Sequence, residues 1–254
     1  MSGPLLVVDD GPVRTITFNR PEVRNAIDQA TATALACALD ELDADPELAV
    51  GVITAVGGHF CAGMDLRAFL ETGIPMTEGR GFGGITARAA DKPLIAAVEG
   101  YALGGGFEIA LACDIIVASR SARFGLPEVK LGLIAGAGGI MRLPQRLPHY
   151  VAMRMILTGD ALEATDAERY GLLSVLCDEG AATATATSLA ARIAANGPLA
   201  IRASKRLVRA ARVWPEDEMF ERQRHIVDPV SASVDAREGV DAFLSHRAPT
   251  WRAR

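Results

Sequence analysis

The chain has 254 residues, of which 50% are hydrophobic and 22% are charged, a composition that is ordinary for a globular protein and argues against disorder. A formal net charge of -5 and a pI near 5.5 argue against binding nucleic acid or an anionic membrane through the overall electrostatic field. They are still compatible with a local basic pocket. Because no apolar run reaches membrane-spanning length and the first residues lack a targeting pattern, we expect a cytoplasmic protein without a membrane partner.

The cysteines and histidines give no sign of a metal site. The four cysteines are widely spaced without a C-x-x-C motif, and the four histidines do not cluster with them. We therefore expect reduced thiols that serve packing, no metal and no separate cofactor.

The N-terminal residues predict a hairpin and then a helix. Residues 5–18 alternate in polarity around the turn Asp10-Gly11, which is typical of two paired strands. Residues 22–46 indicate a helix with Asp28 as its cap and with leucines at helical spacing, namely Leu35, Leu39 and Leu42.

The next segment predicts a strand, a glycine-rich turn and a helix. Residues 49–56, AVGVITAV, fit a short buried strand, and we expect the helix after them to begin near Gly63. Residues 72–88 are rich in glycine and polar side chains, which predicts a mobile segment between helices.

The central stretch, residues 92–139, repeats this pattern. Pro93 to Tyr101 is apolar and bounded by Pro and Gly, as in a buried strand, and three glycines, 104–106, precede the apolar helix FEIALACD. The first amides of a helix have no partner inside it and carry the positive end of its dipole, so this turn is suited to a negative oxygen. The sequence does not decide whether the two strand-turn-helix corners face each other.

Two carboxylates accompany these glycines. Glu108 lies in the first turn of the predicted helix, and Glu128 lies in another Gly/Pro-rich corner, FGLPE. Carboxylates near free amides indicate acid/base chemistry beside an oxyanion hole, whereas a structural interpretation makes Glu108 a helix-capping residue. A dinucleotide site is disfavoured because Ile109 stands where the third glycine of G-x-G-x-x-G would fall.

The remainder of the chain predicts mostly helices. Residues 147–160 and 164–176 indicate a helix, a turn, a short helix and a strand, and Ala181 to Ala195 indicates another helix. The following residues are helical with basic faces. We therefore expect an α/β body over residues 1–195 and a helical region over residues 196–254.

Five motifs occur in an order that resembles the crotonase (enoyl-CoA hydratase/isomerase) family. They are NRPEVRNAID, HFCAGMDLR, KPLIAAVEGYALGGGFEIALACD, FGLPEVKLG and AGAGG, and the likeness runs from about Leu5 to Arg247. The resemblance implies a crotonase-like spiral of ββα units with a C-terminal helical trimerisation region. It also implies a homotrimer or dimer of trimers, and an acyl-CoA or enoyl-CoA substrate whose CoA is not a separate cofactor.

The resemblance also assigns catalytic positions. The oxyanion-hole amides fall on Met64 and Gly105, and hydrating members of the family carry glutamates at both Glu108 and Glu128. The family pattern places a further amide, near the attacking water, at Gly136, where some other members have an acidic residue.

CoA contacts are implied in three parts of the chain. They fall on the N-terminal motif, on the FCAG turn and on the AFLSHR stretch of the last helix, at Arg24, Ala26, Ala62, Asp65, Leu66, Arg67 and Phe243. The chain departs from the family pattern at His246, where lysine is common, and at Ala135, where hydratases often have proline.

The family pattern is most like an enoyl-CoA hydratase, which adds water reversibly across a 2,3 double bond, as in fatty-acid β-oxidation. The GGGFE and MRLP stretches also resemble carnitinyl-CoA dehydratases, so the alternative is another acyl-CoA lyase or an isomerase of the family, such as a dehydratase of this type. A NAD-dependent oxidoreductase and a silent acyl-CoA-binding or RNA-binding scaffold are rivals of other classes. The incomplete glycine fingerprint, the intact carboxylates and the acidic pI argue against these rivals.

Overall fold

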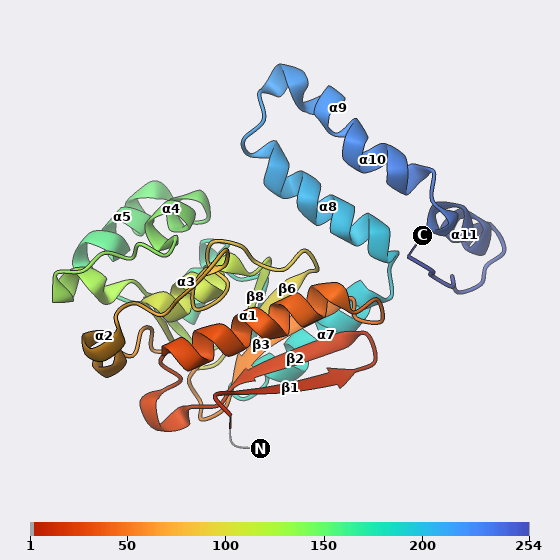
Figure 1. The fold of residues 1–254 in the computed structure, drawn as a ribbon. Coiled ribbons are helices and arrows are strands. Elements are labelled where there is room, and N and C mark those ends of the chain that lie inside the picture. The colour runs from red at the N-terminus through yellow and green to blue at the C-terminus, as the bar shows by residue number, and fades with distance from the viewer. Residues whose placement is uncertain (1–2, 254) are drawn as a thin grey trace.

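A six-stranded sheet forms the centre of the protein (Figure 1), and the computed structural model describes residues 3–253. Its order is β1-β2-β3-β6-β8-β11. Only β1 and β2 pair antiparallel, and every later neighbour is parallel. The strands are β1 Leu5–Asp10, β2 Val13–Phe18, β3 Val50–Ala55, β6 Leu94–Val98, β8 Ile115–Ser119 and β11 Val175–Cys177.

The predicted hairpin and first helix are confirmed. The hairpin closes with Asp10 opposite Val13, and α1 (Gln29–Ala44) follows it. The carboxylate of Asp28 accepts a hydrogen bond from the amide of Thr31 at 2.8 Å, which satisfies a free donor of the first turn. The three leucines at helical spacing are fully buried in the main core.

The predicted strand from Pro93 to Tyr101 is divided between two sheets. β6 belongs to the central sheet, whereas β7 (Tyr101–Leu103) joins a three-stranded sheet in the order β10-β9-β7, with β9 Arg123–Gly125 and β10 Leu162–Glu163. The chain turns at Gly100, whose φ is +51° and where a side chain would collide with Gly58 and His59. A window of uniform hydrophobicity cannot reveal this turn, because both strands are buried.

One predicted helix boundary is displaced by a few residues. The helix expected near Gly63 begins later, as α2 (Leu66–Thr72), because the carboxylate of Asp65 caps it by accepting from the amides of Arg67 and Ala68.

Residues 72–88, which the sequence predicts as a mobile segment between helices, contain regular structure and lead into a strand. They contain the small hairpin of β4 (Met76–Thr77) and β5 (Gly81–Phe82), and they bury Phe82 and Ile85 in the main core. The hairpin is fixed to α1 by an ion pair of 2.5 Å between Arg80 and Asp40. Composition misled the prediction here, since buried apolar residues are interspersed among the glycines.

Helices cover both faces of the central sheet. α3 follows β7, and α7 packs its buried alanines Ala182, Ala186 and Ala190 against the sheet in a second apolar cluster. The helices of the body are α3 Gly105–Ala112, α4 Gly139–Arg142, α5 His149–Thr158, α6 Ala164–Arg169 and α7 Ala182–Ala194. The 3-10 helices are η1 Pro21–Val23, η2 Pro127–Leu131 and η3 Leu143–Gln145. The helices and the strand predicted over residues 147–195 are thus confirmed.

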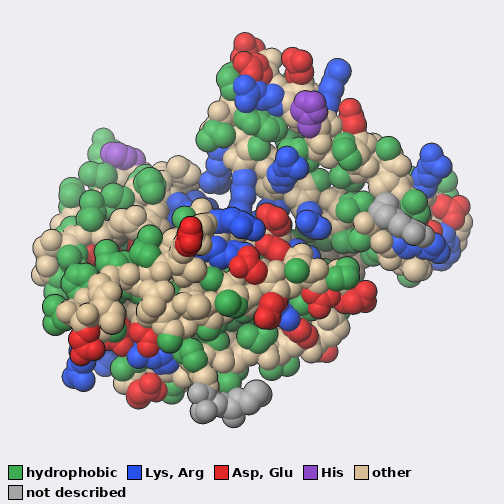
Figure 2. Space-filling view, viewed as in Figure 1, with side chains coloured by type: hydrophobic (Ala, Val, Ile, Leu, Met, Phe, Trp, Pro, Cys, Tyr) green, Lys and Arg blue, Asp and Glu red, His purple; other side chains and the backbone are tan. Residues whose placement is uncertain are grey.

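The last four helices form an arm beside the sheet (Figure 1). They are α8 Pro198–Ala211, α9 Met219–Arg222, α10 Arg224–Ser231 and α11 Val234–Leu244, with η4 at Glu216–Glu218. Lys205 and Arg209 of α8 pair with Asp114 of the body at 2.6 and 3.1 Å. Figure 2 shows Lys and Arg side chains gathered in the hollow between arm and body. No helix within residues 3–253 has both the length and the apolarity needed to cross a membrane.

Candidate active site

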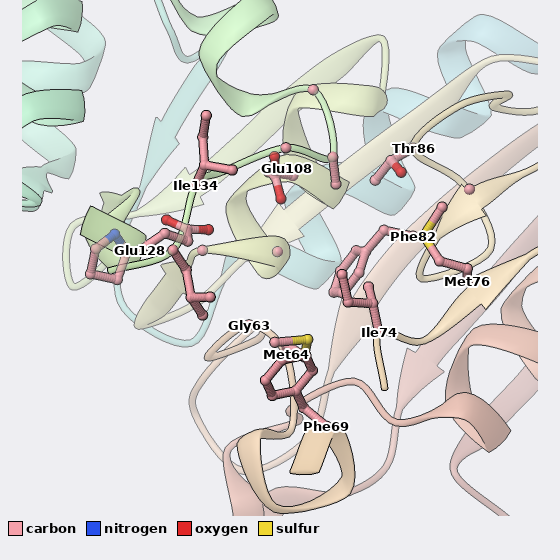
Figure 3. A pocket seen from close by; sticks show the side chains of 18 of the residues that line it. Gly63, Met64, Phe69, Ile74, Met76, Phe82, Thr86, Glu108, Glu128 and Ile134 are labelled. Atoms are coloured by element: carbon pink, nitrogen blue, oxygen red, sulfur yellow. The ribbon is translucent and has the colours of Figure 1, made fainter. Parts of the chain in front are cut away.

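A cavity of about 640 Å³ opens where the glycine-rich turns meet (Figure 3). Its walls come from four segments: α2 with the turn before it, the β4–β5 hairpin, the start of α3, and the chain from η2 to α4. Most of the lining is apolar, including Phe69, Ile74, Met76, Phe82, Leu131 and Ile134. A substrate with an apolar part can therefore be enclosed here and kept from water.

The two strand-turn-helix corners face each other, which the sequence left undecided. A Cβ atom built on Gly63 would stand 3.0 Å from the carbonyl oxygen of Leu103 and 3.4 Å from the amide nitrogen of Gly105. The amide of Leu103 donates to the carbonyl of Cys61 at 3.0 Å. Main-chain pairing thus holds both turns at one end of the cavity.

Each turn presents a free amide. The neighbours of Met64 pair with Ile27, through Ile27 N to Gly63 O at 2.8 Å and Asp65 N to Ile27 O at 2.9 Å. Within residues 3–253 the amide of Met64 itself donates no hydrogen bond, and neither does that of Gly105, the first residue of α3. Both residues line the cavity, so the two amides can hold one negative oxygen.

Glu108 lies beside these amides and is only 3% exposed. Its Oε1 accepts a hydrogen bond of 2.8 Å from the amide of Gly139. The pKa of Glu108 is raised to about 7, mainly by burial and also by the charge of Glu128, while the hydrogen bond from Gly139 acts in the opposite direction.

Glu128 faces the same space from η2 (Figure 3). Its Oε1 would lie 3.0 Å from a Cβ on Gly104, so the carboxylate lies close against the glycine turn, and the φ of +52° at Gly104 favours glycine there. Its Oε2 is buried without a hydrogen-bond partner within residues 3–253, and burial raises its pKa. Two carboxylates that both favour protonation, beside two free amides, can exchange protons with a ligand whose oxygen the amides hold.

Of the other residues predicted around the FCAG turn and at Gly136, all but Asp65 and Arg67 reach the cavity. Ala62, Leu66 and Gly136 line it, while Asp65 caps α2 and pairs with Arg20 at 3.0 Å. The amide of Gly136 donates to the carbonyl of Ile134 at 2.8 Å, so it is engaged within its own loop.

The remaining predicted CoA contacts lie outside the cavity. Arg24 and Arg67 are exposed, and the Arg24 guanidinium carbon lies 5.9 Å from the ring centre of Tyr101. Ala26 is buried beside them. Phe243 of α11 is 80% exposed and does not line the cavity of its own chain.

Sequence reasoning missed the roles of Gly139 and Arg142. Gly139 supplies the hydrogen bond to Glu108, and Arg142 lines the cavity near that carboxylate. Both lie in the stretch from AGAGG to MRLP, where no local pattern indicates the partners of these residues. No group of three or more His, Cys, Asp or Glu side chains in the described part of the chain could hold a metal ion.

The sheet, the facing turns and the cavity together define a protein of the crotonase fold. A family model described as enoyl-CoA hydratase/isomerase matches residues 10–254. The chain is 41% identical over 262 residues, covering both chains fully, to a carnitinyl-CoA dehydratase of Salmonella typhi. The structure of an enoyl-CoA hydratase from Mycobacterium tuberculosis H37Rv superposes with a TM-score of 0.98 at 49% identity, again over 100% of both chains. A carnitinyl-CoA hydratase from Mycobacterium avium gives a TM-score of 0.79 at 42% identity, with both chains fully covered.

The chain therefore belongs to the enoyl-CoA hydratase/isomerase family, within the crotonase superfamily. The fold expected from the sequence motifs is confirmed.

Proposed function

We propose that the protein is an enoyl-CoA hydratase, which adds water reversibly across the 2,3 double bond of an enoyl-CoA thioester. The observation that carries this proposal is the pair Glu108 and Glu128 in one apolar cavity, beside the free amides of Met64 and Gly105. Hydration needs two proton transfers and one developing oxyanion, and these four groups supply them.

The two amides would bind the thioester oxygen. Attack of water on the conjugated thioester moves negative charge onto that oxygen, and each amide donor aimed at it stabilises the transition state by roughly 3 to 4 kcal/mol. This electrostatic mechanism needs no metal and no cofactor beyond the CoA of the substrate.

The two carboxylates would hold the attacking water between them. One removes a proton from the water while the other delivers a proton to the α-carbon, and the reverse reaction exchanges these roles. A pKa of about 7 lets Glu108 gain or lose a proton near neutral pH. The proposal requires one proton on the pair and leaves open which glutamate carries it.

The CoA part would lie outside the cavity, along the FCAG turn. Arg24 and Arg67 are exposed there and could pair with phosphates, since a guanidinium binds phosphate oxygens in a bidentate manner. Ala26, Ala62, Asp65 and Leu66 would contact the remainder. A contact from Phe243 would have to come from another copy of the chain, because α11 lies on the opposite side of the molecule from α2 and the FCAG turn (Figure 1).

A carnitinyl-CoA dehydratase is the second candidate, supported by the relative from Salmonella typhi at 41% identity. Loss of water from a 3-hydroxyacyl thioester uses the same carboxylates in reverse, so the catalytic groups do not separate the two reactions. The apolar lining, including Ile74 and Met76, suits an uncharged acyl chain. The ring of Phe69 and the two carboxylates also suit a fixed positive charge, so the lining alone does not separate the two substrates.

Initial rates of the purified protein should separate the candidates. We expect loss of the enoyl thioester absorbance without added NAD or metal, for trans-2-enoyl-CoA thioesters compared in a chain-length series. A higher kcat/KM for dehydration of carnitinyl-CoA would favour the second candidate. Absence of both reactions, or an isomerised product by mass spectrometry and NMR, would contradict the proposal.

We also propose a cytoplasmic homotrimer or dimer of trimers. Four free cysteines suit a reducing compartment, and the arm leaves large apolar side chains uncovered in one chain, including Val213, Phe220, Phe243 and Leu244. Light scattering at micromolar concentration should give the mass of three or six chains. A monomer under these conditions would contradict the assembly, and Phe220→Ser should weaken it.

A further inference from the structure

Arg142, the last residue of α4, joins two walls of the cavity. Its Nη2 donates to the carbonyl of Thr86 at 2.5 Å, and its Nη1 donates to the carbonyl of Ala137 at 3.3 Å. Thr86 belongs to the wall that follows the β4–β5 hairpin, and Ala137 belongs to the loop before α4. In Figure 3, Thr86 and Glu128 lie on opposite sides of Glu108. The guanidinium therefore connects two segments that are distant in sequence and that line the cavity from different sides.

This guanidinium is half-buried without an ion pair. No Asp or Glu oxygen within residues 3–253 lies within 4.0 Å of it. Burial lowers the pKa of Arg142, and the charge of Glu108 opposes that effect while Arg209 of α8 adds to it. Because a buried cation without a close counter-ion is unfavourable, its place in the cavity wall points to a function other than stability.

The elements that hold Arg142 also hold Glu108. Gly139, at the start of the same short helix, donates to Oε1 of Glu108, and Arg142 fixes the carbonyl two residues before Gly139. The charged groups that act on Glu108 are Glu128 from η2, which disfavours its ionised form, and Arg142 from α4, which favours it.

We propose that Arg142 is a positioning residue for Glu108, which ties the loop that carries the hydrogen-bond donor of Glu108 to the opposite wall of the cavity. The inference rests on the proposed hydration chemistry of that carboxylate. It has two separable parts, because the hydrogen bonds to Thr86 and Ala137 set the geometry, while the positive charge biases the protonation of Glu108.

Two substitutions separate these parts. Arg142→Met removes both the hydrogen bonds and the charge, and it should lower kcat for enoyl-CoA hydration by roughly 10- to 100-fold, since a small misplacement of a catalytic group has effects of this size. Arg142→Lys keeps the charge but cannot hold two carbonyls with a planar fork. This variant should therefore also have a lower kcat, while the pKa of Glu108 should stay close to its value in the parent.

The titration is measured directly, by the ¹³C chemical shift of the Glu108 carboxyl in glutamate-labelled protein, with Glu108→Gln used for assignment. The pKa of Glu108 should rise in Arg142→Met and stay near the parent value in Arg142→Lys. Arg146→Met is the matched control, because the Arg146 side chain is also half-buried, does not line the cavity, and within residues 3–253 donates only to the carbonyl of Arg142, which the substitution at 146 leaves in place. It should leave both kcat and the titration unchanged.

An unchanged kcat and an unchanged titration in a folded Arg142→Met protein would overturn the inference, as would equal effects in Arg146→Met. If Arg142→Met does not fold, Arg142→Gln takes its place in the same comparison. If the parent protein has no hydratase activity, the proposed function fails, whereas the ¹³C titration still tests the link between Arg142 and Glu108.

Discussion

Glu108→Gln and Glu128→Gln should each lower kcat for enoyl-CoA hydration by ~10²-fold or more. Glutamine keeps the shape of the side chain and can still accept the hydrogen bond that Gly139 donates to Glu108. It cannot take a proton from water or deliver one to carbon. The substitutions therefore remove proton transfer while leaving the cavity and the two free amides of Met64 and Gly105 in place.

Binding of a saturated acyl-CoA provides the control for this prediction. Its dissociation constant, measured by calorimetry, should change little in either variant, because the thioester oxygen still meets the same amides. The loss of kcat in the double variant should be much smaller than the two single losses combined, since both carboxylates act on one water. Hydration near the parent rate by either single variant, with a melting temperature close to the parent, would remove that residue from the mechanism. It would then favour an isomerase or a non-catalytic role.

The sequence predicted those parts of the fold whose structure is determined by residues close together in the chain. The Asp28 cap, the leucines that follow it, and the glycine turn before Glu108 are each determined by a few neighbouring residues. The structure places them as the pattern indicates. The order of the motifs along the chain then indicated the family, which the comparisons show.

The parts that the sequence did not predict depend on contacts between distant segments. The hairpin within residues 72–88 is stabilised by α1 and the core, and its glycine content alone suggested a loop. The facing of Gly63 and Gly105 depends on pairing between segments that are distant in sequence, as in the hydrogen bond from Leu103 of β7 to Cys61, which lies before Gly63. The contact of Arg142 with Thr86 spans 56 residues and has no local signature.

Burial of Glu108 should also make the protein less stable as the pH rises. Its pKa of about 7 in the folded state lies above the value of about 4.3 expected in the unfolded chain. A carboxyl with a raised folded pKa binds its proton more tightly in the folded state. Its favourable effect on folding is therefore complete below the unfolded pKa and is lost as the pH rises towards 7. Above pH 7 the folded protein must hold an ionised, buried carboxylate.

Glu108→Gln should consequently stabilise the protein at pH 8 and have a smaller effect at pH 5. The gain in the free energy of unfolding at pH 8 should be about 1 to 3 kcal/mol, because one pKa unit corresponds to about 1.4 kcal/mol and the buried amide of glutamine offsets part of the gain. For a chain of this size, each kcal/mol raises the melting temperature by about 2 to 4 °C.

Urea unfolding of the parent and the variant at the two pH values measures this difference. Glu47→Gln is the matched control, because Glu47 is exposed, and it should not change the pH dependence. A purely structural Glu108, which accepts from Gly139 and does not cap α3, should instead lose a little stability on substitution at both pH values. A variant that is less stable than the parent at pH 8 would therefore contradict the raised pKa and the place of Glu108 in proton transfer. A variant that is slower in hydration yet more stable at pH 8 would show that the fold gives up stability to keep this carboxylate in the cavity.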